Sequence, residues 1–196
     1  MLMKATIFEK PGLEKLKINH DVELPKITDH DVLIRVKMAG VNPIDNTTVS
    51  GTREIKPLPH ISGAERSGVV EDCRRHVKSL KKGDRVIVYN IMFDGICDMC
   101  MSGNELLCRN GGLLGLVANG GFAEYIAVPE KSAFRIPDES QWDLAASLPV
   151  TTLTPYHALK QAALKINEFF LIFGASRITG MMATQFGKKM KSYRSL

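Results

Sequence analysis

The chain has 196 residues, of which 44% are hydrophobic and 24% are charged, and its formal net charge is +5. This length fits one ample domain or two small ones, and the composition is that of a globular protein. The N-terminus, MLMKATIFEK, lacks the apolar core of a signal peptide. The apolar stretches fall short of the roughly 20 residues that a membrane span needs, so we expect a cytoplasmic protein with no membrane partner.

The positive charge lies at the C-terminal end. Residues 169–196 carry five basic side chains and no acidic one, which leaves equal numbers of basic and acidic residues in 1–168. No aromatic platform or groove-reading motif stands beside these basic residues. We therefore interpret them as a solvated basic segment and expect no nucleic-acid partner.

The first two thirds of the chain contain short segments typical of β-strands. They are rich in Val and Ile or alternate between apolar and polar residues, and PG, NP, KKGD and two NGG sequences separate them. The segments are MKATIFE (3–9), VLIRVKMAGV (32–41), RSGVVED (66–72), DRVIVYN (84–90), FAEYIAV (122–128) and AFRIP (133–137). This pattern predicts a small barrel of antiparallel strands.

From about Ser140 the hydrophobic period becomes helical. ESQWDLAASL and TTLTPYHALKQAAL carry apolar residues at helical spacing, and Pro155 in the second segment predicts a helix start or a kink near that residue. FFLIFG (169–174) then reads as a buried strand, followed by a helix over TGMMATQFGKKM (179–190). We expect one domain over 1–139 and a second segment over 140–196.

The order of several motifs points to one protein family. GVNPIDNTTVSG, PHISGAERSGVV, KKGDRVIVYN, a Cys cluster, NGGFAEYIAVPE and LPVTTLTPYHAL follow one another up to about Met190. Together they resemble the medium-chain dehydrogenase/reductase superfamily, which includes zinc-type alcohol dehydrogenases and quinone reductases. The resemblance implies a mixed β and α/β fold, in which a GroES-like β-barrel precedes the first β-α unit of a Rossmann domain.

The Cys cluster is a candidate zinc lobe at about 91–112. DGICDMCMSGNELLC presents Asp94, Cys97, Cys100 and Cys108. Relatives with a structural zinc have four Cys at this spacing, so Asp94 takes the place of the first Cys. Zinc binds tetrahedrally and accepts thiolate sulfur or carboxylate oxygen. We expect these four residues to hold a structural zinc ion, since none of the four positions is left open for a substrate.

Two other interpretations of the cysteines compete with zinc. A disulfide is disfavoured in the cytosol, and a redox CxxC motif would need a thioredoxin-like context that the sequence lacks. The fourth cysteine, Cys73, lies apart from the cluster and is interpreted as an ordinary strand residue.

The resemblance implies no catalytic metal. The positions that bind catalytic zinc in the alcohol dehydrogenases fall at Asn42, Ala64 and Val150, and the proton-relay hydroxyl would fall at Ile44. Asn is a poor zinc ligand, and Ala and Val have no donor atom. We therefore assign no catalytic residue.

Two acidic residues persist at family positions. Asp45 and Glu65 are interpreted as structural partners of a nearby Arg or Lys, although acid–base chemistry is the alternative. The sequence Asn42-Pro43 with Asp45 is similar to the zinc-free quinone reductases of the superfamily, which need a nicotinamide cofactor but no catalytic metal.

FGASRITG (173–180) resembles the turn that carries the pyrophosphate of NAD(P). Gly174, Ser176 and Gly180 are candidate cofactor-binding residues, but Arg177 stands where the family has a small residue. Glycine is needed in such a turn so that the backbone can approach the phosphates. We expect a vestigial site, with the alternative that Arg177 reaches outward and adds a cation.

The remaining residues, KSYRSL, contain no acid for the ribose and no Val/Ile-rich strand. The resemblance then indicates a truncated or frame-shifted alcohol dehydrogenase-like product. We expect it to be inactive alone, to turn over no small-molecule substrate and to self-associate through uncovered apolar faces. The alternatives are an active NAD(P)H-dependent oxidoreductase completed by oligomerisation and a zinc-binding interaction module.

Overall fold

The computed structural model describes residues 1–52, 55, 57–190 and 193–195. The chain divides into two compact units, Met1–Ser147 and Leu148–Leu196. The division falls later than the expected boundary after residue 139, because helix α3 (Trp142–Ala146) packs against strands β3 and β5 of the first unit. No helix in the described part of the chain is both long and apolar enough to cross a membrane.

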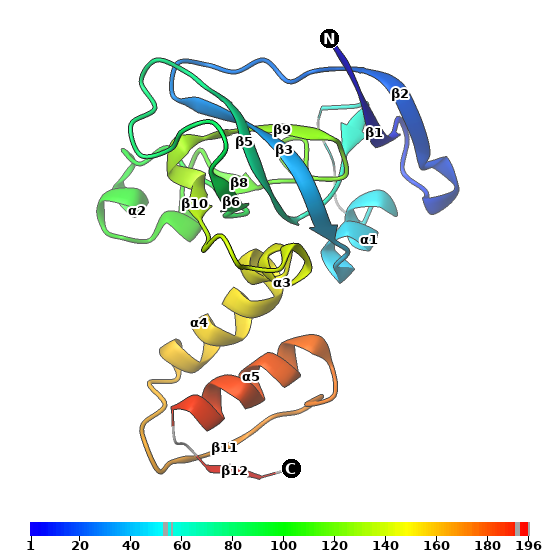
Figure 1. Cartoon of the computed structure of the whole chain (residues 1–196). Helices are drawn as coiled ribbons and strands as arrows, with labels where there is room; N and C mark the ends of the chain where they lie inside the picture. Colours follow the sequence, from blue (N-terminus) through cyan, green and yellow to red (C-terminus); the bar gives the residue numbers. More distant parts are fainter. Residues whose placement is uncertain (53–54, 56, 191–192, 196) are drawn as a thin grey trace. The chain divides into compact units, whose positions relative to one another are not determined.

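A five-stranded antiparallel sheet forms the centre of the first unit (Figure 1). Its strands, in spatial order, are β10 (Ala133–Arg135), β6 (Arg85–Val88), β5 (Glu65–Cys73), β3 (Asp31–Gly40) and β9 (Tyr125–Pro129). Each coincides with a segment predicted from alternation. The expected strand positions are therefore confirmed, to within a few residues at their ends.

A second antiparallel sheet has the order β2 (Lys17–Glu23), β1 (Leu2–Phe8) and β4 (His60–Ile61). Strand β1 was expected, whereas β2 and β4 were not. Backbone hydrogen bonds connect β1 to the segment before β9: Thr6 donates to the Phe122 carbonyl at 2.8 Å, and Glu124 donates to that of Lys4 at 3.0 Å. The two sheets are thus joined along β1.

The core of the first unit is aliphatic. Strand alternation directs Val32 and Ile34 of β3 and Val86 and Val88 of β6 to the same interior, where all four are fully buried. The same cluster contains Val70, Leu80, Leu114, Ile126, Val128 and Ala133. A smaller cluster under β1 contains Met3, Ala5, Ile7 and Ile61.

Short elements connect the strands of the first unit. They are η1 (Leu13–Lys15), α1 (Pro43–Val49), β7 (Ile91–Met92), α2 (Asp98–Met101), η2 (Glu105–Leu107), β8 (Gly112–Leu113) and η3 (Glu130–Ser132). Helix α1 follows β3 directly, and α2 lies in the cysteine-bearing excursion between β7 and β8.

The second unit begins with a π-helical segment, Leu148–Thr152, which runs into α4 (Leu153–Gln161). Pro155 lies in the first turn of α4, so the expected helix start near this residue is confirmed. Strand β11 (Phe169–Leu171) and helix α5 (Ile178–Lys189) also lie where they were predicted. The expectation that this strand is buried is wrong: Phe169 and Leu171 are 75% and 57% exposed, since β11 belongs to a sheet of two short strands. Helices α4 and α5 pack together.

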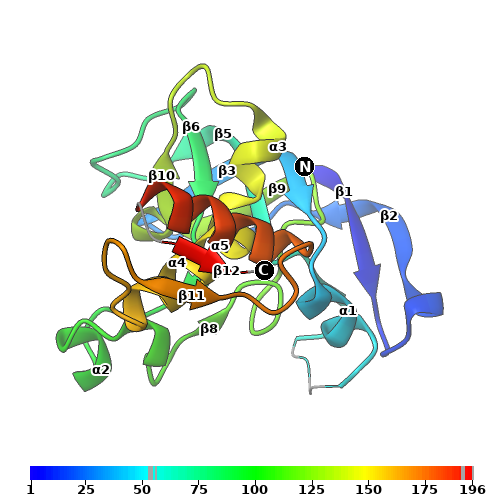
Figure 2. The same ribbon diagram turned by 90° about the horizontal axis from the view of Figure 1, so that it is seen from below.

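The last element was not predicted from the sequence. Strand β12 (Tyr193–Ser195) pairs in parallel with β11, so β11, α5 and β12 form a β-α-β unit (Figure 2). The first β-α unit is therefore followed by a second short strand. The segment KSYRSL has no run of Val or Ile, so its composition does not predict a strand. The strand forms because its backbone pairs with that of β11.

Candidate metal centre

Strands β7 and β8 form the base of the cysteine-bearing excursion. They pair antiparallel through Ile91 with Leu113 and Met92 with Gly112. Between them, Asp94 lies in the loop after β7, Cys97 caps the N-terminus of α2, Cys100 lies on α2, and Cys108 follows η2. A two-stranded base with two tight helical turns above it brings together four residues that are spread over fifteen positions of the chain.

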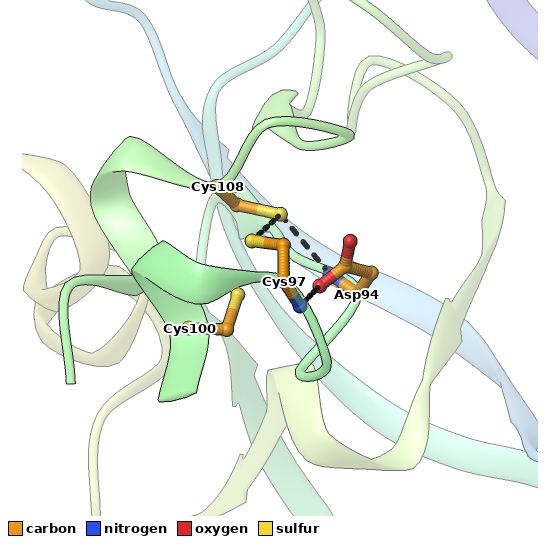
Figure 3. Close-up of side chains that lie close together, drawn as sticks. All are labelled: Asp94, Cys97, Cys100 and Cys108. Atoms are coloured by element: carbon orange, nitrogen blue, oxygen red, sulfur yellow. Dashed lines mark hydrogen bonds between the residues drawn. The ribbon is translucent and has the colours of Figure 1, made fainter. Parts of the chain in front are cut away.

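Figure 3 shows that the four side chains converge. One ligand atom from each of Asp94, Cys97, Cys100 and Cys108 lies within 4.8 Å of all the others. The Sγ atoms of Cys97 and Cys108 are 3.9 Å apart. Two sulfurs on one tetrahedral zinc ion, with Zn–S bonds of about 2.3 Å, lie about 3.8 Å apart. The spacing of the side chains therefore suits a zinc ion.

The same distance does not correspond to a disulfide. A disulfide joins its sulfurs at about 2.05 Å, and Cys73, Cys97, Cys100 and Cys108 are all free thiols. Cys73 ends strand β5 and donates its S–H to the Leu80 carbonyl at 3.6 Å. It lies outside the ligand group, as the sequence analysis expected.

Hydrogen bonds hold Asp94 in its ionised form. Its Oδ1 accepts the backbone N–H groups of Ile96 at 2.8 Å and Cys97 at 3.0 Å. Its Oδ2 accepts one bond from Asn110 Nδ2 at 2.7 Å. The backbone donors at Cys97 and Ile96, followed by Asn110, hold the pKa of the Asp94 carboxyl well below its usual range. Oδ2 keeps a further lone pair with which to bind a cation.

The thiols have unequal proton affinities. Backbone hydrogen bonds from Arg109 and Cys100 lower the pKa of Cys97, whereas burial raises the pKa of Cys100 to about 12. The backbone N–H of Asp94 donates to Cys108 Sγ at 3.3 Å. Because zinc binds thiolates, a cation at this position would displace the Cys100 proton.

An ion pair that the sequence analysis did not identify braces the excursion. Arg109 donates from Nε and Nη2 to the two carboxylate oxygens of Asp98, each at 2.6 Å. This bidentate pair joins helix α2 to the residue after Cys108. Neither residue has a local sequence signal, because the pair forms only when the excursion closes.

The positions at which relatives bind catalytic zinc have no metal-binding geometry. Asn42 and Ala64 are buried in the first unit, and Val150 lies in the π-helical segment of the second. Among the described residues, the Asp94 and Cys group is the one set of three or more His, Cys, Asp or Glu side chains close enough together to share a metal ion. The residues at these three positions therefore do not fit a catalytic zinc ion.

Asp45 accepts hydrogen bonds that stabilise the interior of the first unit. It lies in the first turn of α1 and is 4% exposed. Its Oδ2 accepts the backbone N–H of Asn42 at 2.8 Å. Its Oδ1 accepts from Ser62 Oγ at 3.2 Å and from the backbone N–H groups of Gly63 at 3.1 Å and Ala64 at 3.0 Å. Asp45 thereby ties the start of α1 to the turn between β4 and β5.

Arg66 is the buried basic residue whose charge interacts with those of Asp45 and Glu65. Its side chain is fully buried, and Nη1 donates to the Gly63 carbonyl at 2.7 Å. Burial lowers the pKa of Arg66 to about 10, against the opposing effects of the charges on Asp45 and Glu65. Burial also raises the pKa of Asp45 and outweighs the hydrogen bonds from Asn42 and Ser62. The three charges are therefore arranged for mutual compensation in the interior.

The candidate dinucleotide turn keeps part of its glycine geometry. Gly174 has φ +80°, and a Cβ on Gly180 would lie 2.3 Å from the Gly174 carbonyl oxygen. Gly180 is buried in α5, whereas Gly174 and Ser176 are exposed. The residue at position 180 must therefore be small, because the backbone of the turn approaches the helix closely there.

Arg177 caps the N-terminus of α5. Its Cγ and Cδ atoms both lie 3.9 Å from the point where a Cβ on Gly174 would stand. The aliphatic stem of Arg177 therefore lies beside the turn at the N-terminus of α5. A long side chain thus stands at position 177, where the resemblance implies a small one.

Comparison with known proteins identifies the family of the chain. Residues 28–138 match the family model for the alcohol dehydrogenase GroES-like domain. An alcohol dehydrogenase from Geobacillus stearothermophilus is 37% identical over 96% of this chain and 56% of its own length. A quinone oxidoreductase from Homo sapiens is 31% identical over 95% of this chain and 50% of its own.

A solved structure extends the similarity to three dimensions. The cobalt- and zinc-bound thermostable alcohol dehydrogenase from Pyrobaculum aerophilum has a TM-score of 0.93 and 38% identity. The match covers 99% of this chain and 59% of that one. The chain belongs to the medium-chain dehydrogenase/reductase superfamily and contains its alcohol dehydrogenase GroES-like domain. It spans about half the length of the curated relatives that it matches.

Proposed function

We propose that this chain is a zinc-braced, alcohol dehydrogenase-like protein that lacks catalytic competence by itself. The observation that carries the zinc proposal is the convergence of one carboxylate and three thiols within 4.8 Å. The cobalt and zinc bound by the Pyrobaculum aerophilum relative support a metal in this family. Asp94, Cys97, Cys100 and Cys108 would supply four ligands and leave no open coordination position.

Such an ion would brace the excursion between β7 and β8. The residues between these strands form only short helical turns, and apolar side chains there, such as Ile96 and Met101, are 80% and 75% exposed. Little hydrophobic burial is available to hold the turns. Metal–ligand bonds would replace that missing burial and link binding to local folding.

Metal analysis of purified protein tests the zinc proposal. We expect one zinc ion per chain, and we expect Asp94→Ala and Cys97→Ser each to weaken zinc binding at least tenfold. Glu105→Ala is the matched control, since it removes another acid of the excursion, in η2, that contributes no ligand atom to the group. Zinc binding that Asp94→Ala leaves unchanged would show that the four-ligand assignment is wrong.

The second part of the proposal concerns the cofactor. Arg177 against the dinucleotide turn, together with Asn42, Ala64 and Val150 at the catalytic-metal positions, supports a chain that binds NAD(P) weakly and does not catalyse alone. We expect NADH and NADPH to bind more weakly than about 1 mM in fluorescence titrations. We expect Arg177→Gly to strengthen that binding, because it frees the approach to the turn.

The alternative function is that of an active NAD(P)H-dependent oxidoreductase, and one result would favour it. Saturable binding of NADH or NADPH to the unaltered protein, tighter than about 1 mM, would indicate an active oxidoreductase whose site is completed in an oligomer. Quinone or alcohol turnover that depends on protein concentration would support the same conclusion.

We also propose that the chain forms a dimer or larger assembly. Phe169, Leu171 and Phe173 in and after β11 are 75%, 57% and 90% exposed, which is unusual for three neighbouring large apolar residues. Sedimentation should show an assembly that Phe173→Asp weakens, and a strictly monomeric species would contradict the proposal.

The free thiols of the excursion further support residence in a reducing compartment such as the cytoplasm.

A further inference from the structure

Sheet topology brings two histidines together at one end of the central sheet. Strands β3 and β5 pair antiparallel, with Val32 opposite Cys73. The residues that enter β3 therefore lie beside the residues that leave β5. His30 precedes β3 and His76 follows β5, so these positions are neighbours although 46 residues separate them in the chain.

Backbone hydrogen bonds hold the two segments in place. The N–H of His76 donates to the Asp29 carbonyl at 3.0 Å, and the N–H of Arg74 donates to the Asp31 carbonyl at 3.3 Å. On the other side, the N–H of Glu130 donates to the His30 carbonyl at 3.0 Å. Both histidines are therefore positioned by the sheet and its connections before any ligand arrives.

The imidazole rings present nitrogen atoms to each other. Nδ1 of His76 and Nε2 of His30 are 3.3 Å apart, with ring centroids separated by 4.8 Å and planes inclined at 51°. Two nitrogens bound to one tetrahedral metal at about 2.0–2.1 Å lie about 3.4 Å apart. The separation of these nitrogens thus suits a shared cation as well as a shared proton.

Charged groups of both signs lie around the pair. Asp29 and Glu130 flank the histidines, and the Asp29 carboxylate forms an ion pair with Arg75. The carboxylate of Glu130 accepts hydrogen bonds from Lys78 and Ser79. Both imidazoles are exposed, so water molecules can complete the coordination of an ion.

We propose that His30 Nε2 and His76 Nδ1 form a second metal site, which binds a divalent transition-metal ion of the type that prefers imidazole, such as Ni²⁺, Cu²⁺ or Zn²⁺. The ion replaces the proton between the two rings and is ligated by two neutral imidazoles and by water. This site offers imidazole nitrogen, whereas the group in the excursion offers three thiolates and one carboxylate, so the two sites differ in the ligands that they present to a metal.

A nickel titration tests this site independently of the cysteines. Protein first loaded with one equivalent of zinc is titrated with Ni²⁺ by calorimetry, and circular dichroism verifies that each variant is folded. We expect saturable Ni²⁺ binding that His30→Ala and His76→Ala each weaken at least tenfold. His20→Ala is the matched control, since it removes an exposed histidine of β2 and should leave Ni²⁺ affinity unchanged.

The thiolate group has its own control. Cys97→Ser should reduce zinc content and leave the Ni²⁺ affinity unchanged, whereas a loss of nickel binding in that variant would assign the nickel to the cysteines. Nuclear magnetic resonance adds a direct readout, since paramagnetic Ni²⁺ should broaden the ring signals of His30 and His76 before that of His20. The proposal is wrong if Ni²⁺ binds more weakly than about 1 mM, or if His30→Ala and the unaltered protein bind it with equal affinity. In either case His30 and His76 form a hydrogen-bonded pair and no metal site.

Discussion

Removal of the Asp45 carboxylate should destabilise the first unit strongly. Asp45→Ala leaves four donors without their acceptor in the interior: the N–H groups of Asn42, Gly63 and Ala64 and the hydroxyl of Ser62. Each buried donor without a partner costs about 1–3 kcal/mol, and these penalties are not additive. Arg66 also loses one of its two compensating charges. We expect a total loss of about 3–5 kcal/mol in the free energy of unfolding.

A graded series separates the contributions. Asp45→Asn keeps an oxygen that can accept from Ser62, Gly63 and Ala64, but its amide group cannot accept from Asn42. This variant should lose about 1–3 kcal/mol, which is less than Asp45→Ala loses. Asp21→Ala removes an exposed carboxylate from β2 and is the control, with an expected change within about 0.5 kcal/mol.

The single tryptophan of the chain provides the assay. Trp142 lies in α3, within the first unit, and its carbonyl accepts a hydrogen bond from Ser67 Oγ at 2.8 Å. Urea unfolding followed by Trp142 fluorescence therefore reports on the unit that contains Asp45. If Asp45→Ala unfolds at the same urea concentration as Asp21→Ala, the acceptor role assigned to Asp45 is incorrect.

Three further changes test the packing and charges of the first unit. Gly68→Ala should lose about 1–3 kcal/mol, because the added Cβ would stand 2.4 Å from the Arg35 carbonyl oxygen, and an unchanged urea midpoint would contradict this. Arg85→Lys should lower the thermal midpoint in circular dichroism, since the guanidinium stacks 3.9 Å over the Trp142 ring and donates to the Asp138 and Ser140 carbonyls, a geometry that an ammonium cannot match. Hydrogen bonds from Ser79 and Lys78 lower the pKa of Glu130 below its ordinary 4.5, so its stabilising effect is complete above about pH 4.5 and is lost as the pH falls through the lower pKa of the folded protein. The stability gap between the unaltered protein and Glu130→Gln, about 0.5–1 kcal/mol at pH 7 because water screens this largely exposed carboxylate, should therefore narrow on acidification, and a gap that does not change with pH would refute this assignment.

The sequence alone predicted the features that depend on neighbouring residues. Alternation located the strands that contain Val32, Val86 and Ile126, because a strand directs successive side chains to opposite faces. The two-residue separation of Cys97 and Cys100 predicted that their sulfurs would converge, because a tight turn covers such a distance, and the family resemblance added Asp94 and Cys108 to the group. Motif order predicted the family, and the matched GroES-like domain confirms it.

Tertiary structure decided the features that join distant parts of the chain. Three of the four hydrogen bonds to Asp45 depend on the turn after β4, and burial of Arg66 depends on the closure of the same region. His30 and His76 become neighbours only through the antiparallel register of β3 and β5, and β12 becomes a strand only by pairing with β11. Local periodicity carries no information about which donor meets which acceptor across such separations. The pairing of donors with acceptors is determined by the register of the strands and by the hydrogen bonds that buried polar groups require.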